Sequence, residues 1–523
     1  MADVRVPVSY YENFLESLAR IVSKLLTDRE TEAVLSSIRS FQDKLHRMSS
    51  QNLLRLQMEA SEDSQGGKAS PHQCKHEGKT CSQNCTRGFL KAFAVGFGVK
   101  YLIAILPALL MGKVFKRPSI LWRAADRDTA RFALFLSTFL GSYKGINCLL
   151  RRHGSLSERV NSFIAGAIAG MALMIDRDKR RRQSIMLYLL TRSIQFTGAW
   201  LMKQWAIHRH EKKKDHDTPP PPPQAKGWDD HIAGFMQRWA GVGVMMLASS
   251  ELMYALLFHQ DTMPKSYYSF LLTHAGWRSY VGKMAAPLSV SIGETINGFA
   301  SDPKMSIRMP PNTTSREFIA THVSPSIASV IPPGIRHHYI MCALQHPLEA
   351  SCTHDKINLF RGEFARAFKL YFPLNVIMTA VFRSGQIVTQ PSVVLRKFLR
   401  SCLQSTIFLA MYVTMGLASP CAMRPILGKE RPWMYLVPGA VGGAMTFIEA
   451  PGRQLELGMY CLPRALESWW NILVKSGYAR NLPFGDVALF MLATGTLMTM
   501  YQNDKDTISP HYLSVMTRFF GNN

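Results

Sequence analysis

The feature that most constrains this chain is a long stretch that occurs twice. Residues 118–192 and residues 391–464 share identical or similar residues at a nearly constant offset of 273 positions. Matching pairs at this offset are Pro118 and Pro391, Cys148 and Cys421, Arg151 and Arg424, Gly166 and Gly439, and Gly170 and Gly443. The offset is far longer than the roughly 20–50 residues of a solenoid repeat. We therefore interpret the chain as an internal duplication in which each copy is a whole bundle.

Both copies consist of apolar blocks separated by basic segments. A bilayer core about 30 Å thick requires roughly 20 residues of helix, and most of the blocks approach that length. The blocks lie near residues 92–112, 130–150, 160–175, 184–205 and 240–258, and then near 367–382, 398–418, 435–449, 457–474 and 484–500. The pattern predicts an all-α, multi-pass (polytopic) membrane protein with two homologous helical bundles of about four to five spans each.

Composition divides the chain into four segments. We expect a soluble N-terminal arm over residues 1–73, and a first membrane repeat over 74–275 with a solvated polyproline loop at 208–228. A linker follows over 276–337, and a second membrane repeat covers 338–523. The linker is rich in Pro, Ser and Thr, so we expect little core there. Five spans per copy would invert the second repeat across the membrane and four would leave the copies parallel, and both arrangements stay open.

The charge balance indicates an anionic membrane surface as a partner. The chain has 61 Lys and Arg against 36 Asp and Glu, a formal net charge of +25. These basic residues lie between apolar blocks and not on one soluble face, which favours anionic lipids over nucleic acid. We expect as partners the lipid bilayer, anionic lipids and other organelle membrane proteins, with no nucleic acid. Self-association stays an open possibility.

Glycine pairs four residues apart recur in the apolar blocks. Such a pair puts two residues without side chains on one helix face, so that a neighbouring helix can approach closely. The predicted helix-packing residues are Gly141, Gly145, Gly166, Gly170, Gly439 and Gly443.

Charged and polar residues within the apolar blocks form a second group of candidates. Burying a charge within a membrane span costs at least roughly 2.5–3.5 kcal/mol, so each should face a partner or water. The candidates are Arg192, Gln195, Arg464, Glu467, Asp176, Glu449 and Glu251, with Asp176 and Glu449 as possible partners of the two arginines. Two interpretations stay open: an anion-attracting polar path, or structural ion pairs and snorkelling side chains.

A group of Cys and His residues precedes the first apolar block of each copy. Sulfur and imidazole are the ligands that zinc prefers in proteins, although neither spacing is that of a standard zinc finger. The candidate metal ligands are Cys74, His76, Cys81 and Cys85 in the first copy, and Cys342, His346 and Cys352 in the second. A disulfide or a purely structural role is also open. We find no motif for an organic cofactor or for catalysis, so none is expected.

Three motifs resemble those of the transmembrane protein 135 family, also called peroxisomal membrane protein 52. They are Cys74-Lys-His76-x4-Cys81-x3-Cys85, Gly141-Ser-Tyr-Lys-Gly145-Ile-Asn-Cys148 and Ile164-Ala-Gly166-x3-Gly170-Met. The match covers roughly residues 70–276 and, more loosely, 338–521. More distantly, the glycine-rich spans resemble the mitochondrial inner-membrane import-channel family. The resemblance implies a multi-pass protein of mitochondria or peroxisomes, without established catalytic residues.

The expected function follows from that resemblance. It implies a non-enzymatic integral membrane protein that affects mitochondrial dynamics, peroxisome organisation and lipid metabolism. The alternative is a transporter or channel for a small anionic or lipid metabolite, with Arg192 and Arg464 lining its path.

Overall fold

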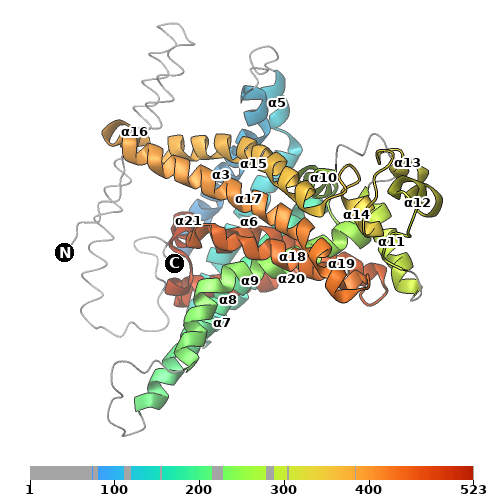
Figure 1. Cartoon of the computed structure of the whole chain (residues 1–523). Helices are drawn as coiled ribbons and strands as arrows, with labels where there is room; N and C mark the ends of the chain where they lie inside the picture. The colour runs from blue at the N-terminus through green and yellow to red at the C-terminus, as the bar shows by residue number, and fades with distance from the viewer. Residues whose placement is uncertain are drawn as a thin grey trace. The chain divides into compact units, whose positions relative to one another are not determined.

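The computed structural model describes residues 74, 80–110, 119–153, 156–214, 228–277, 288–302, 306–382 and 384–521. Regular structure in these ranges is helical throughout, apart from one isolated bridge between Arg308 and Tyr339 (Figure 1). The all-α prediction is therefore confirmed for the described part of the chain. The N-terminal arm, the run of prolines and His76 lie outside the described residues.

Five of the described helices are long and apolar enough to cross a membrane. They run over Cys81–Ile105, Arg127–Arg152, Glu158–Ile175, Arg238–Phe258 and Pro391–Leu427. Each overlaps one of the predicted apolar blocks. These helices indicate an integral membrane protein.

The other five predicted blocks are helical but do not meet the criteria for a span. Residues 435–449 form three short pieces, η4 (Pro432–Tyr435), α18 (Leu436–Ala444) and η5 (Met445–Ile448). The remaining blocks lie in four helices, α8 (Lys179–Lys214), α15 (Cys352–Phe382), α19 (Pro451–Lys475) and α20 (Gly485–Asn503). The first three contain charged residues or a proline in their interior, which lowers their affinity for lipid, and α20 ends in the polar residues Gln502 and Asn503.

The described residues form two compact units. Unit 1 contains residues 256–260 and 264–454, and unit 2 contains residues 74–255, 261–263 and 455–521. The units cut across the two sequence copies, because unit 2 combines helices of the first copy with the end of the second. Its helices are α3 (Cys81–Leu110), α5 (Ser119–Ala124), α6 (Arg127–His153), α7 (Glu158–Gly170), α8, most of α9 (Trp228–Phe258), most of α19, α20 and α21 (Pro510–Phe520).

Unit 1 holds the linker and the start of the second copy. Its helices are α10 (Lys265–His274), α11 (Leu288–Ser301), α12 (Ser315–His322), α13 (Pro325–Ala328), α14 (Ile340–Gln345), α15, α16 (Ser384–Thr389), α17 (Pro391–Leu427) and α18. The expectation of little core in the linker is wrong. Ile292 and Ile296 of α11, Ile319 of α12 and Ile327 of α13 are at most 1% exposed. Its Pro, Ser and Thr residues begin or cap these short helices, as Thr314 does for α12, and do not keep the segment open.

The order of elements recurs along the chain. The first copy runs α3, α5, α6, α7, a 3₁₀ turn, α8, α9, a 3₁₀ turn and α10. The second runs α15, α16, α17, η4, α18, a 3₁₀ turn, α19, α20, a 3₁₀ turn and α21, so that it differs from the first among the described elements by η4. In each copy, the first and third elements of this order pack against one another: α3 with α6, and α15 with α17.

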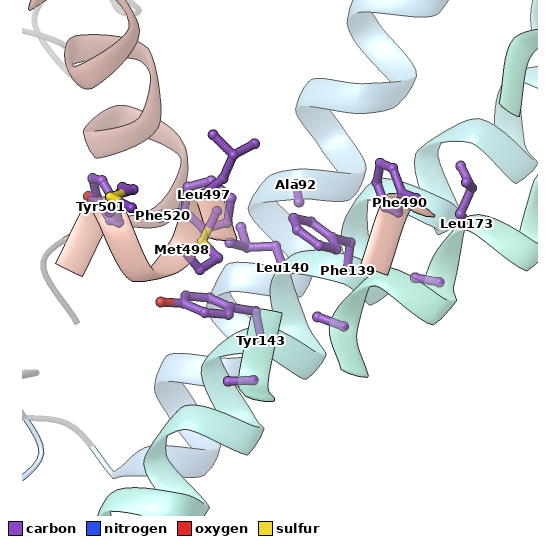
Figure 2. Close-up of a cluster of buried hydrophobic side chains, with 14 of the residues drawn as sticks. Ala92, Phe139, Leu140, Tyr143, Leu173, Phe490, Leu497, Met498, Tyr501 and Phe520 are labelled. Carbon is purple, nitrogen blue, oxygen red and sulfur yellow. The ribbon is translucent and has the colours of Figure 1, made fainter. Parts of the chain in front are cut away.

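The core of unit 2 is built by helices from both ends of the chain. Figure 2 shows Phe139 and Tyr143 of α6 near Phe490 of α20 and Phe520 of α21. Ring centroids lie 6.1 Å apart for Phe139 and Phe490, and 5.6 Å apart for Tyr143 and Phe520. Tilted and edge-on rings at these separations interact favourably beyond the area they bury. Aromatic packing therefore fixes α20 and α21 on α6.

Glycines of α7 bring that helix into backbone contact with α20. A Cβ atom added to Gly166 would lie 2.8 Å from the carbonyl oxygen of Thr494, and one added to Gly170 would lie 2.8 Å from the Cα of Met491. The Thr494 hydroxyl also donates a 3.0 Å hydrogen bond to the carbonyl oxygen of Gly166. Any side chain on this face of α7 would push the helices apart.

The other predicted packing glycines lie in comparable places. Gly141 and Gly145 of α6 face α3, where added Cβ atoms would come within 3.3 Å of Phe89 and 3.5 Å of the Cys85 sulfur. Gly439 and Gly443 are buried in α18. It is the neighbouring Gly442 that lies against α17: a Cβ atom added to it would lie 2.9 Å from the carbonyl oxygen of Tyr412.

The α7–α20 contact predicts a large difference between two glycine substitutions. Gly170→Ala should lower the free energy of unfolding by about 1–3 kcal/mol, because the added methyl group meets the Met491 backbone. Gly198→Ala on α8 is the control: its added Cβ meets no described atom within 4 Å. The control should be neutral or slightly stabilising, since alanine favours helix. Thermal unfolding of the detergent-purified chain measures both, and equal melting temperatures would contradict this packing.

Candidate metal centre

Four Cys and His side chains converge in unit 1. The Sγ atoms of Cys342, Cys352 and Cys421 and a ring nitrogen of His346 all lie within 4.8 Å of one another. Cys342 belongs to α14, His346 follows that helix directly, Cys352 begins α15, and Cys421 lies near the end of α17. The cluster therefore joins the start of α15 to the end of α17, at one end of the helix pair that these two form.

The distances within the cluster fit a tetrahedral zinc site. The sulfurs of Cys342 and Cys352 are 3.6 Å apart, and Nε2 of His346 is 3.2 Å from the sulfur of Cys352. A zinc–sulfur bond of about 2.3 Å implies about 3.8 Å between two sulfur ligands of a tetrahedron. A disulfide requires about 2.05 Å. Three sulfurs and one imidazole are thus placed to bind one ion and are too far apart for a covalent bond.

The imidazole of His346 is oriented by its surroundings. Its Nδ1 lies 2.7 Å from the carbonyl oxygen of Glu349 and donates to it, which leaves the lone pair of Nε2 for the cluster. His337 supports the same turn, with Nε2 3.0 Å from the Glu349 carbonyl oxygen and Nδ1 2.9 Å from Ser315 Oγ. Burial lowers the pKa of His337, so this ring is neutral at pH 7 and can both donate and accept.

A buried arginine faces the sulfurs. Arg424, one turn after Cys421 on α17, is 1% exposed. Its Nη1 lies 3.4 Å from the sulfur of Cys342, 3.5 Å from that of Cys421 and 3.2 Å from Oε1 of Gln345. N–H groups of a cation aimed at sulfur stabilise thiolates, the form that binds zinc.

The N–H groups on the opposite side of this guanidinium also have hydrogen-bond acceptors. Its Nε donates to the Glu430 carboxylate, and its Nη2 lies 3.3 Å from the hydroxyl of Tyr435. That hydroxyl donates a 2.9 Å hydrogen bond to Glu430. Glu430 is 3% and Tyr435 1% exposed, so the ion pair is removed from water. A buried pair of this kind persists only when its hydrogen bonds are made.

The structure brings three of the predicted ligands together and adds a fourth. Cys342, His346 and Cys352 are in the cluster, whereas sequence reasoning used Cys421 only as a marker of the duplication. Cys421 lies 69 residues after Cys352, so no local spacing could reveal it. The available signal was the recurrence of Cys-x2-Arg inside an apolar helix of each copy.

In the first copy, Cys74 and Cys81 lie beside Cys148, with the three sulfurs within 4.8 Å of one another. Cys85 is turned away: its sulfur lies 3.0 Å from the carbonyl oxygen of Gly141. All nine cysteines of the chain belong to the described residues, and none of them is in a disulfide there.

The predicted polar residues form ion pairs with partners other than those expected. Arg192 of α8 is 4% exposed, and its Nη2 lies 2.7 Å from Glu456 of α19. Its Nη1 lies 2.8 Å from Gln195, and its guanidinium lies 4.5 Å from the centre of the Tyr512 ring. Arg192 is thus enclosed by a carboxylate, an amide and an aromatic ring, which favours a structural role.

Four more of the predicted polar residues pair with residues that are close to them in the sequence. Asp176 pairs with Arg181, and Glu449 lies 3.7 Å from Arg453. Arg464 Nη1 lies 3.3 Å from Glu467 on the same helix face. Glu251 on α9 is different, because neither carboxylate oxygen has a hydrogen-bond partner among the described residues.

The buried arginine next to the sulfurs predicts a double-mutant result. Arg424→Met should destabilise the protein by about 3–5 kcal/mol, because it leaves Glu430 buried without its counter-charge. The double variant R424M/E430Q should recover part of that loss. Arg396→Met, at an exposed position on the same helix, is the control and should change little. Thermal unfolding in detergent measures all three; a double variant no more stable than R424M would contradict the pairing.

No protein-family model matches this chain. No solved structure matches it either.

Proposed function

We propose that the chain is a non-enzymatic, multi-pass organelle membrane protein whose unit 1 is held together by a structural zinc ion. The cluster of Cys342, His346, Cys352 and Cys421 carries the proposal. Zinc is usually four-coordinate, and a catalytic zinc keeps one position for water or substrate. Four protein ligands fill every position, so this site is suited to fixing α14, α15 and α17 and not to a reaction.

We further propose that the two copies arose by duplication of one ancestral unit. The recurring order of elements supports this, and so does a recurring polar pattern. Cys148 is followed by Arg151 and its partner Glu158, and Cys421 by Arg424 and its partner Glu430. A buried Cys-x2-Arg with a following acid is an uncommon combination in an apolar helix, because each charge there needs a partner.

Exposed apolar side chains support the membrane location. Leu90, Val95, Val99, Leu102 and Ile103 of α3 are between 43% and 65% exposed. Exposed apolar residues also occur on α15 and α17: Phe368, Leu370, Phe372, Leu374, Leu395, Leu399 and Leu403. Apolar surface of this extent is suited to contact with lipid tails.

The organelle and the role are proposals that rest on the resemblance to the transmembrane protein 135 family. We propose that the protein acts in mitochondrial or peroxisomal membranes, where it affects organelle morphology and lipid content. The ion pairing of Arg192 with Glu456 weighs against the transport alternative, since that arginine is already neutralised.

A rescue experiment tests role and zinc site together. Cells that lack the protein should show altered mitochondrial or peroxisomal morphology and lipid content, and the wild-type chain should restore both. Cys421→Ser should fail to restore them, because it removes a zinc ligand. Cys402→Ser is the matched control, a buried cysteine on the same helix outside the cluster, and should rescue fully. Unchanged organelles and lipids in the deletion, or rescue by C421S, would contradict the proposal.

A further inference from the structure

We infer that unit 2 binds a second zinc ion through the thiolates of Cys74, Cys81 and Cys148. Their three sulfurs lie within 4.8 Å of one another, and those of Cys74 and Cys81 are 3.7 Å apart. That separation is close to the roughly 3.8 Å expected between two sulfur ligands of tetrahedral zinc. It is far from the roughly 2.05 Å of a disulfide.

The position of this site in its unit matches that of the centre in unit 1. Cys81 begins α3 as Cys352 begins α15. Cys148 lies near the end of α6 as Cys421 lies near the end of α17, and α3 packs against α6 as α15 packs against α17. In both units a metal ion would therefore tie the start of one long helix to the end of the next.

The charge environment matches as well. Arg151 lies one turn after Cys148 and is 2% exposed. Its Nε lies 3.1 Å from each carboxylate oxygen of Glu158, at the start of α7. The ion pair with Glu158 holds this buried guanidinium one turn from Cys148, where a positive charge favours the thiolate form of a cysteine. Arg151 and Glu158 thus repeat the ion pair of Arg424 and Glu430, with an acid whose side chain is 29% exposed in place of one that is 2% exposed.

The donor set indicates a soft metal. Three thiolates suit zinc or copper(I) and exclude hard cations such as magnesium. Cys85, only one turn after Cys81, does not belong to the set, because its sulfur faces the Gly141 carbonyl oxygen. Within the described ranges the group consists of these three cysteines, which fill three of zinc's four positions.

The metal content of matched variants tests this site separately from the centre in unit 1. The full chain is purified in detergent without chelators, and zinc per chain is measured by inductively coupled plasma mass spectrometry. We expect two zinc ions in the wild type, one in Cys148→Ser, one in Cys421→Ser and none in the double variant. Cys85→Ser, on the same helix as Cys81, is the control and should keep both.

Each failure has a distinct meaning. One zinc in the wild type and in C148S, with none in C421S, would overturn the second site and leave the first. Copper in place of zinc, lost only in C148S, would overturn the choice of metal. If C148S does not fold, cobalt(II) titration of the metal-free wild type decides: thiolate-to-cobalt absorption should saturate at two equivalents, and saturation at one would overturn the site. Alkylation of the denatured, chelator-treated chain without reductant should label all nine cysteines, and a disulfide that involves Cys74, Cys81 or Cys148 would also overturn the site.

Discussion

The structure of unit 1 depends on gathering thiolate, imidazole and guanidinium groups in a largely buried place, where Cys342, His346 and Arg424 are at most 2% exposed. Each of them alone would be costly to bury. Together they are mutually satisfied: a cation between Cys342, His346, Cys352 and Cys421 would balance the sulfurs, and Arg424 donates to two of these sulfurs and to Glu430. This cluster constrains how the helices pack, because α14, α15 and α17 must each bring a ligand to the same point. Zinc binding and folding are coupled in such a site, since the ligands are held together only in the folded state.

The same arrangement gives the chain a way to stabilise long apolar helices that lipid alone does not hold together. Helices in a bilayer gain nothing from exchanging lipid contacts for one another on hydrophobic grounds, so small residues, polar contacts and cross-links determine their packing. Unit 2 uses all three: the Gly166 and Gly170 face against α20, the Arg192–Glu456 pair between α8 and α19, and the thiolate cluster between α3 and α6.

The helical fold was largely predictable from the sequence, because apolar blocks of nearly 20 residues leave few alternatives. Their division into compact units was not, since α19, α20 and α21 pack with helices some 300 residues earlier and no local pattern records that. The core in the linker was missed because Pro and Ser at helix starts have the same composition as a loop.

The metal site was predictable in part from the sequence. Cys342, His346 and Cys352 share one short segment, whereas Cys421 reaches them only through the antiparallel packing of α15 and α17. Cys85 was predicted as a ligand in the first copy because it is close to Cys81 in the sequence. In the structure its sulfur lies on another face of α3, against the Gly141 carbonyl oxygen.

The central claim is that three sulfurs and one imidazole enclose zinc at the junction of α14, α15 and α17. X-ray absorption spectroscopy at the zinc edge, on the detergent-purified C148S variant, examines that junction by itself. The account predicts a first shell of three sulfur atoms at about 2.3 Å and one nitrogen at about 2.0 Å, with the outer-shell scattering of an imidazole ring. A shell of oxygen and nitrogen atoms without sulfur, or a purified chain free of zinc, would contradict it.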